Sequence, residues 1–202
     1  MFVQVIQGKV ADRDQVKAAL DRWFTDLAPG SVGWQSSTAG VTDDGTAIVI
    51  VCFESADAAR RNGERPEQHQ WWMDTSKLFS GEVAFHDSEQ VMTYGEAPTR
   101  DAGFVQVMQG RIKDPARLAE LSEKLSSVMR QERPDVLGWI AALHSDGSGD
   151  ATEAVYFASE ESAREGERHE PSPEARQVMT EQMSQFEVST YYDVRQPWIT
   201  LR

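Results

Sequence analysis

A polar and aromatic segment at Asn62–Trp72, with the sequence NGERPEQHQWW, holds side chains suited to binding a small organic molecule. The amide of Asn62 can both donate and accept hydrogen bonds. His69, Trp71 and Trp72 follow within the same segment. Neighbouring helical positions point about 100° apart, so one tryptophan is expected to face the core and the other the lid of a cleft or solvent. The alternative is that both tryptophans only pack.

Residues elsewhere in the first half complete this candidate site. The proposed substrate-binding residues outside the segment are Gln4, Trp23, Trp34 and His86, and Arg65 and Trp71 join them from within it. Gln4 lies in an apolar segment, where an unpaired amide costs about 1–3 kcal/mol, so it must line a cleft or bond to a protein partner. For Arg65, an ion pair with a nearby glutamate is the competing interpretation.

The histidines argue against a metal centre. The four of them, His69, His86, His144 and His169, show neither HxH nor HExxH spacing, so we expect no metal site. His144 or His169 could in principle be an axial haem ligand, although a lone histidine is more often a surface or satisfied residue. The sequence also has no glycine-rich phosphate loop, GxSxG elbow or Cys-His nucleophile.

The elements that must position these residues occur twice. FVQVIQGKV at Phe2–Val10 returns as FVQVMQGRI at Phe104–Ile112, with six of nine positions identical. Strand-like and helical patterns then follow in the same order in both halves, which predicts β-α-β-β-α-β twice. We expect an α+β fold of two ferredoxin-like repeats packed sheet to sheet. The predicted ranges are 1–94 for the first repeat, 95–103 for a linker and 104–202 for the second repeat with a tail.

The two halves differ most around the candidate segment. Aligning Phe79 with Phe186 places Trp71 opposite Val178 and Trp72 opposite Met179. One copy can keep a site after duplication while the other becomes scaffold. We therefore expect the cleft in the first half, under Asn62–Trp72.

Composition limits the kinds of molecule that the protein is expected to bind. The formal net charge of −13 over 202 residues disfavours nucleic acid and anionic membrane surfaces. The single cysteine, Cys52, lies in an apolar run and cannot form an internal disulfide. Neither a leader pattern nor an apolar run of ~20 residues is present, so we expect a cytoplasmic protein with a small-molecule ligand.

Three paired motifs carry a family resemblance. They are the FVQV(I/M)QG strands, the strand starts Gly33-Trp34 and Gly138-Trp139, and the pair ESADAARRNGERPE and SEESAREGERHEP. With these the chain resembles the dimeric α/β-barrel superfamily, and within it the antibiotic-biosynthesis-monooxygenase-like (ABM) domains, here as a tandem duplication. The resemblance implies an internal pseudo-dimer and leaves a further homodimer open.

The resemblance also implies candidate functions. The first is a cofactor-independent monooxygenase acting on an aromatic or polyketide-type molecule, with Asn62, Trp72 and His69 as catalytic residues and no bound cofactor. The second is a non-enzymatic small-ligand-binding module. The third is a haem-binding or haem-degrading protein.

Overall fold

The computed structural model describes residues 1–202, apart from the side chain of Glu123. The chain forms two compact units. The first unit consists of residues 1–89 and 194–202, and the second unit of residues 90–193. Among the described residues, none of the helices is long and apolar enough to cross a lipid bilayer.

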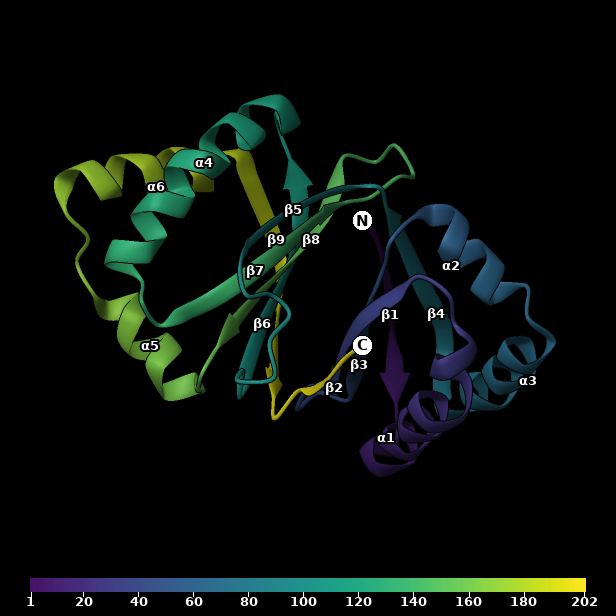
Figure 1. Ribbon diagram of the computed structural model, residues 1–202. Coiled ribbons are helices and arrows are strands. Elements are labelled where there is room, and N and C mark those ends of the chain that lie inside the picture. The colour runs from purple at the N-terminus through teal and green to yellow at the C-terminus, as the bar shows by residue number, and fades with distance from the viewer. The chain divides into compact units, whose positions relative to one another are not determined.

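The first unit is a five-stranded antiparallel sheet with helices on one face (Figure 1). Its strand order is β10-β2-β3-β1-β4. The elements in chain order are β1 (Phe2–Val10), α1 (Arg13–Arg22), β2 (Trp34–Val41), β3 (Thr46–Phe53), α2 (Ala56–Gly63), α3 (Pro66–Thr75), β4 (Phe79–Ser88) and β10 (Trp198–Leu201). A π-helical turn, Trp23–Leu27, extends α1 and buries Trp23 and Leu27. The first unit also contains two short 3₁₀ turns, Ala28–Gly30 and Ser76–Leu78.

The second unit repeats this plan. Its strand order is β5-β7-β8-β6-β9, and α4 and α6 lie side by side over one face (Figure 1). The elements in chain order are β5 (Gln90–Gly95), β6 (Phe104–Ile112), α4 (Pro115–Glu132), β7 (Val136–Leu143), β8 (Asp150–Phe157), α5 (Glu160–Arg168), α6 (Pro173–Gln185) and β9 (Phe186–Arg195). The predicted α+β class with two ferredoxin-like repeats is confirmed.

The sheet edges explain where the repeats end. The sequence pattern predicts one strand over Glu82–Tyr94, and a tail, Arg195–Arg202, without a counterpart in the first half. The structure instead divides the first stretch into β4 and β5, and the tail forms β10. β5 pairs with β7 and β10 pairs with β2, so each short strand covers an edge that would otherwise be left open. The boundary between the two compact units consequently lies after Glu89, whereas the predicted first repeat extends to Tyr94.

The glycine of the repeated strand is required by packing in both halves. Gly110 of β6 lies so close to the neighbouring strand β9 that an added Cβ would meet the carbonyl oxygen of Glu187 at 2.1 Å. At Gly8 of β1, the same atom would meet the ring of Phe79 at 2.7 Å. A side chain at either position would therefore push the edge strand away.

Sheet register corrects one of the paired motifs. Trp34 pairs with Phe53, and Val136 holds the matching place opposite Phe157. Trp139 instead pairs with Val155. In the first unit, the residue opposite the equivalent Val51 is Ser37. A β-bulge follows both Trp34 and Val136, so the Gly-Trp pairs at 33–34 and 138–139 are not structurally equivalent.

Candidate functional site

The second unit contains a cavity of about 460 Å³ between its sheet and its helices. Cavities of this size hold small organic molecules. The wall is largely apolar and comes from four strands, three helices and the residue after α4. The lining residues are Gln106, Met108, Leu125, Met129, Arg133, Val136, Trp139, Glu153, Val155, Phe157, Glu167, Met179, Gln182, Met183, Phe186, Val188 and Tyr191.

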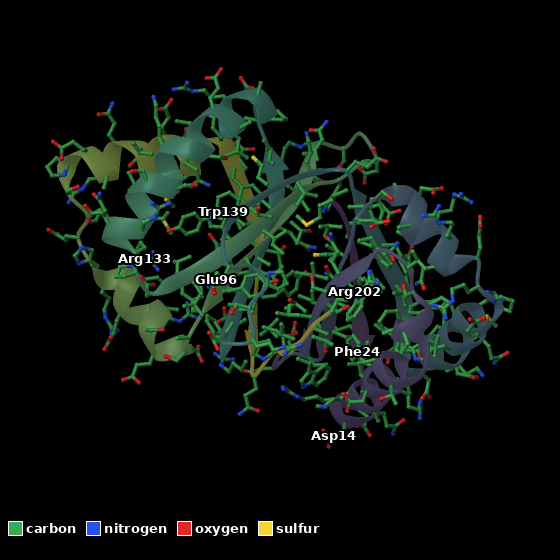
Figure 2. The ribbon with its side chains drawn as sticks, viewed as in Figure 1. Asp14, Phe24, Glu96, Arg133, Trp139 and Arg202 are labelled. Atoms are coloured by element: carbon green, nitrogen blue, oxygen red, sulfur yellow. The ribbon has the colours of Figure 1, made fainter. Side chains whose placement is uncertain are left out.

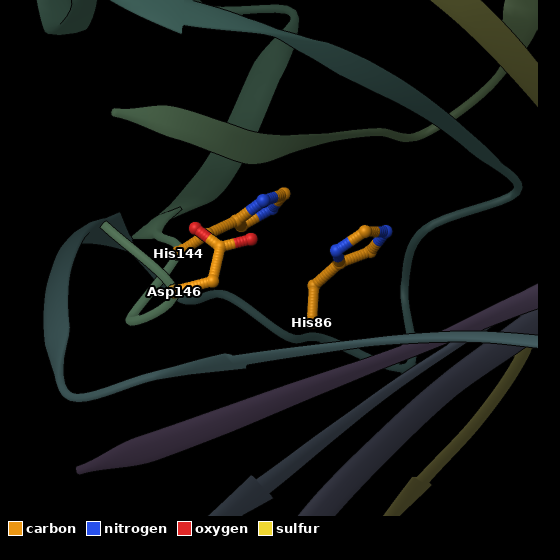
Figure 3. A group of neighbouring side chains, drawn as sticks. All are labelled: His86, His144 and Asp146. Carbon is orange, nitrogen blue, oxygen red and sulfur yellow. The ribbon is translucent and has the colours of Figure 1, made fainter. Parts of the chain in front are cut away.

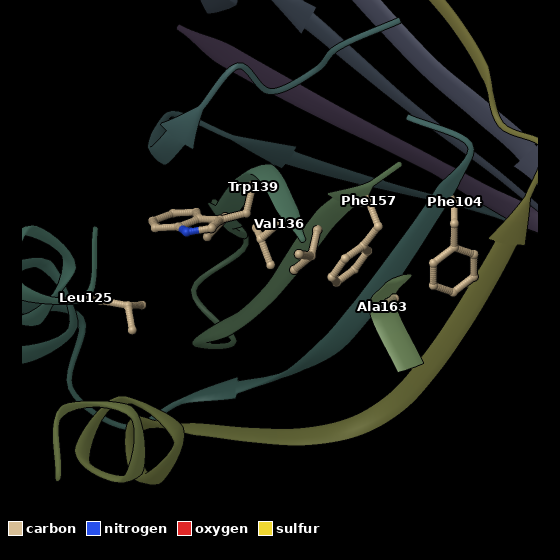
Figure 4. Packing of buried hydrophobic residues seen from close by; sticks show 8 residues of the cluster. Phe104, Leu125, Val136, Trp139, Phe157 and Ala163 are labelled. Carbon is tan, nitrogen blue, oxygen red and sulfur yellow. The ribbon is translucent and has the colours of Figure 1, made fainter. Parts of the chain in front are cut away.

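Strand alternation brings the floor of the cavity together. Glu153 of β8 pairs with Met108 on one side and Ala141 on the other. Two residues along β8, Val155 pairs with Gln106 and Trp139. Residues two apart on a strand face the same side, so Trp139 and Glu153 are diagonal neighbours on the face that carries the cavity. Figure 4 shows Trp139 on the same side of the sheet as Leu125 of α4.

Glu153 is the unusual polar group of this floor. Its carboxyl has no hydrogen-bond or ion-pair partner among the described side chains and backbone groups. Burial raises the pKa of Glu153 from 4.5 to about 7, because an apolar surrounding disfavours the charged form. Glu153 is half-buried and lines the cavity. Glu153 therefore changes its charge near neutral pH.

Trp139 forms a second part of the floor. Its side chain is 4% exposed and stacks on Tyr94 with ring centroids 6.2 Å apart. The indole N–H is buried and has no acceptor in the described part of the chain. Figure 2 labels it together with Arg133, the residue that follows α4. Trp139 is also the only tryptophan of residues 90–193, and the other five tryptophans of the chain belong to the first unit.

Three other polar side chains of the wall, Gln106, Arg133 and Glu167, are paired with residues outside the wall. Arg133 Nη2 donates to Asp135 Oδ2 at 2.8 Å, and both side chains are nearly buried. Gln106 Nε2 donates to Asp193 Oδ1 at 3.2 Å. Arg164 links Asp193 at 2.5 Å and Glu167 at 2.9 Å. These pairs fix the rim of the cavity and leave Glu153 as its one unpaired acid among the described lining residues.

The first unit has a much smaller cavity at the matching place, with a volume of about 60 Å³. Its lining residues are Gln4, Ile6, Leu20, Trp23, Phe24, Ser37, Val49, Val51, Phe53, Asn62, Gln68 and Trp71. Trp23 fills the space, with ring centroids 5.5 Å from Trp34 and 6.4 Å from Trp71. A volume known to hold benzene is about 150 Å³, so this cavity admits a few waters rather than an aromatic molecule.

Four of the predicted site residues line this small cavity: Gln4, Trp23, Asn62 and Trp71. Their polar atoms already have protein partners. Trp23 Nε1 donates to Gln68 Oε1 at 2.6 Å, and Trp71 Nε1 donates to the Ala19 carbonyl at 3.0 Å. Gln4 Nε2 donates to Asp87 Oδ1 at 2.8 Å, the pairing that Gln106 makes with Asp193 in the second unit.

Asn62 and Arg65 form one structural link. Arg65 Nη1 donates to Asn62 Oδ1 at 2.9 Å and to the Leu27 carbonyl at 3.1 Å. The guanidinium also lies 2.9 Å from Glu67 Oε1. Arg65 thus ties α2 and α3 to the end of α1 and makes the glutamate ion pair that was the alternative to substrate binding.

The other predicted residues lie outside the small cavity. Trp34 is not among the lining residues, and its indole N–H donates to Ser37 Oγ at 3.0 Å. Trp72 faces Phe79 and Phe85 with ring centroids 6.1 and 5.2 Å away. His69 is exposed on α3. His86 pairs with Val5, so the two side chains lie on the same face of the sheet. Gln4 is the neighbour of Val5 in β1 and points to the opposite face, so His86 faces away from Gln4 and the small cavity. The structure therefore does not bring Asn62, Trp72 and His69 together around one cavity.

The two haem-ligand candidates also lie away from both cavity walls. His144 follows β7, with Asp146 in the turn beyond it (Figure 3). The Nε2 of His144 shares a hydrogen bond with Thr152 Oγ1 at 2.9 Å. Asp146, in the turn that follows, accepts from the Ser148 backbone N–H at 2.9 Å. His169 Nε2 lies 3.5 Å from Glu132 Oε2. No histidine is among the described residues that line either cavity.

Differences between the repeats explain the two volumes. Counting from the repeated strands, Trp23 matches Leu125, and the helix alignment matches Trp71 with Val178. Val49 matches Glu153 by register, since Val49 pairs with Ile6 as Glu153 pairs with Met108. Sequence reasoning missed Glu153. The available signal was a glutamate inside the apolar run Ala151–Ala158, at the place of a valine in the other repeat.

Three solved structures resemble the whole chain. A candidate monooxygenase from Lactobacillus acidophilus has a TM-score of 0.72 at 14% identity, covering 99% of this chain and 95% of that one. A candidate monooxygenase from Fusobacterium nucleatum has a TM-score of 0.74 at 10% identity, covering 100% and 94%. An anthrone oxidase-like protein has a TM-score of 0.67 at 11% identity, covering 99% and 92%. The chain has the fold of these monooxygenase-like proteins.

This full-length likeness confirms the predicted fold resemblance. Identities of 10–14% carry information on the fold alone. No protein-family model and no curated protein sequence matches the chain. The chemistry must therefore be argued from the cavity itself.

Proposed function

We propose that the second unit binds a flat aromatic small molecule and oxidises it with dioxygen, as a monooxygenase-type enzyme that needs no bound cofactor. The observation that carries this proposal is the cavity of about 460 Å³ with its largely apolar wall. The fold likeness to monooxygenase-like proteins, one of them an anthrone oxidase-like protein, supports it by analogy.

The wall favours an aromatic ligand. Four of the seven methionines of the chain line it, namely Met108, Met129, Met179 and Met183. Thioethers adapt to irregular shapes and make favourable contacts with ring edges. Trp139, Phe157 and Phe186 add ring surfaces that prefer stacked or edge-to-face partners.

The reaction class follows from what such a molecule can do. An activated CH₂ group flanked by aromatic rings reacts with one O₂ to give a carbonyl and one water, which balances atoms and electrons. The electrons come from the substrate once it has lost a proton. The protein's part is to hold the rings, exclude bulk water and accommodate the charge that develops.

The predicted first-half site remains the competing location. Its cavity of about 60 Å³ would have to open before an aromatic molecule could enter, which requires displacement of Trp23 or Trp71. Asn62→Ala distinguishes the two sites. We expect this variant to leave second-unit binding and turnover unchanged.

Anthrone is a suitable probe, because it carries an activated CH₂ between two aromatic rings. We expect anthrone to quench Trp139 fluorescence and to cause oxygen uptake. Leu125→Trp places at this site the residue type that fills the first-unit cavity, and should abolish both signals. The matched control Leu125→Met conserves volume and should keep both. Oxygen uptake that survives in Leu125→Trp but disappears in Asn62→Ala would move the site to the first unit.

A further inference from the structure

The position of Glu153 assigns it a role that neither the fold likeness nor the cavity volume implies. It sits in the floor of the cavity between Met108 and Ala141, with Trp139 as its diagonal neighbour. The groups around it are mainly thioether, methyl and ring surfaces. A carboxyl in such a place loses hydration without gaining a protein partner.

An unpaired acid of this kind has no structural benefit in the described part of the unit. The equivalent position of the first repeat holds Val49, an aliphatic residue that packs in a cluster of hydrophobic side chains. The same fold therefore accepts an aliphatic residue here. A costly acid retained against a functional cavity is the pattern expected of a group that acts on a ligand.

We propose that Glu153 is the proton acceptor of the cavity, and that its ligands are neutral carbon or oxygen acids: aromatic ketones with an activated CH₂, and phenols. This inference rests on the proposed function for the location of the ligand and for its activated CH₂ group. It adds phenols to the ligands and names the residue that ionises them.

The step is a single proton transfer. A C–H or O–H bond of the ligand breaks, its proton joins a carboxylate oxygen of Glu153, and the electron pair stays on the ligand as an enolate or phenolate. The carboxylic acid formed is neutral, as the apolar wall favours. Gln182 of α6, which lines the same wall and has no protein partner among the described residues, offers an amide donor for the ligand oxygen. Dioxygen, the oxidant of the proposed function, then takes electrons from the anion.

Three other titratable side chains face the cavity, and each has a different place. Arg133 is paired with Asp135, and Glu167 is paired with Arg164. Tyr191 of β9 is 60% exposed at the outer end of the wall. Burial brings the pKa of Glu153 to about 7, which suits a base that must be ionised before and protonated after the transfer at neutral pH.

The test separates proton transfer from oxidation. Under argon in D₂O, anthrone is incubated with the full chain, and exchange of its CH₂ hydrogens for deuterium is followed by mass spectrometry. The variants are Glu153→Gln, which keeps the shape, Glu153→Asp, which keeps the acid, and Glu153→Val, which copies the first repeat. Binding of anthraquinone, which has no such hydrogens, is measured for each by Trp139 quenching.

We expect wild-type exchange to rise with pH through about 7 and to fall at least about 100-fold in Glu153→Gln and Glu153→Val, with partial recovery in Glu153→Asp. Anthraquinone affinity should change less than about threefold in Glu153→Gln. Exchange in wild type without oxygen uptake in air would support this inference and refute the proposed function. Oxygen uptake with equal exchange in wild type and Glu153→Gln would refute the inference alone. Failure of both probes to bind at millimolar concentration would refute the cavity as a site, and the inference with it.

Discussion

Removing the buried carboxyl of Glu153 should make the protein less sensitive to pH. In the folded chain the pKa of Glu153 is raised to about 7 from its ordinary 4.5, because burial disfavours the carboxylate. Between these two values the unfolded chain releases this proton while the folded chain keeps it. The unfolded state then binds fewer protons, so stability falls as pH rises through this window.

The size of the effect follows from the interval. At about 1.4 kcal/mol per pH unit, the span from 4.5 to about 7 corresponds to about 3 kcal/mol of unfolding free energy. Below pH 4.5 both states of the wild type hold the proton, and the penalty is absent. Above pH 7 both states release it, and the penalty stays constant. Glu153→Gln has no such group, so its stability advantage over wild type should grow by about 3 kcal/mol between pH 4.5 and 7.

Urea unfolding of wild type and Glu153→Gln at half-unit pH steps from 4 to 8.5 measures this difference. Unfolding is followed by tryptophan fluorescence. Trp139 reports on residues 90–193, and the other five tryptophans are the same in both proteins. Glu82→Gln, at an exposed position of β4, controls for the general loss of one negative charge. A stability difference that stays flat from pH 4 to 8.5 would refute the desolvation argument for Glu153 and show that water reaches its carboxyl freely.

Two further predictions concern the scaffold. Trp71→Val should enlarge the first-unit cavity and destabilise the chain by about 3 kcal/mol, because a packed ring and its hydrogen bond to the Ala19 carbonyl are lost. Urea unfolding measures this loss of stability. A change below about 1 kcal/mol would contradict close packing around Trp71. Deleting residues 198–202 should leave β2 as an open edge, so amide hydrogen exchange at Ser37 and Ala39 should speed up and the protein should self-associate. Unchanged exchange at both residues would contradict the pairing of β10 with β2.

The fold could be predicted because it depends on patterns that a sequence displays directly. The repeated strand, the helical spacing of apolar residues and the turn residues each specify local structure, and their order specifies the topology. The edge strands β5 and β10 were harder to place. Pairing partners of short edge strands depend on contacts between residues far apart in the chain, such as Trp198 with Ala39.

The site was harder to predict for a different physical reason. Asn62, Trp71 and the other polar and aromatic residues of the first half stand out in the sequence, yet such side chains fill space and satisfy each other when they pack. A cavity depends instead on what is missing, as when Leu125 and Val178 stand where the first repeat has Trp23 and Trp71. Volume left unfilled has no sequence signature of its own, and only comparison of the two repeats position by position exposes it.

The two repeats share some residues and differ at others, and the two groups have different physical roles. Residues identical in both repeats, such as Gln4 and Gln106, make the same contact with an aspartate of the edge strand, which marks them as scaffold. The differences then divide into two kinds. In the first repeat they add rings and close the space, which stabilises a core. In the second they remove rings and introduce Glu153, which gives up packing and costs desolvation. Only the second kind of change lowers stability in two ways at once, and a functional ligand is the physical reason that best accounts for both.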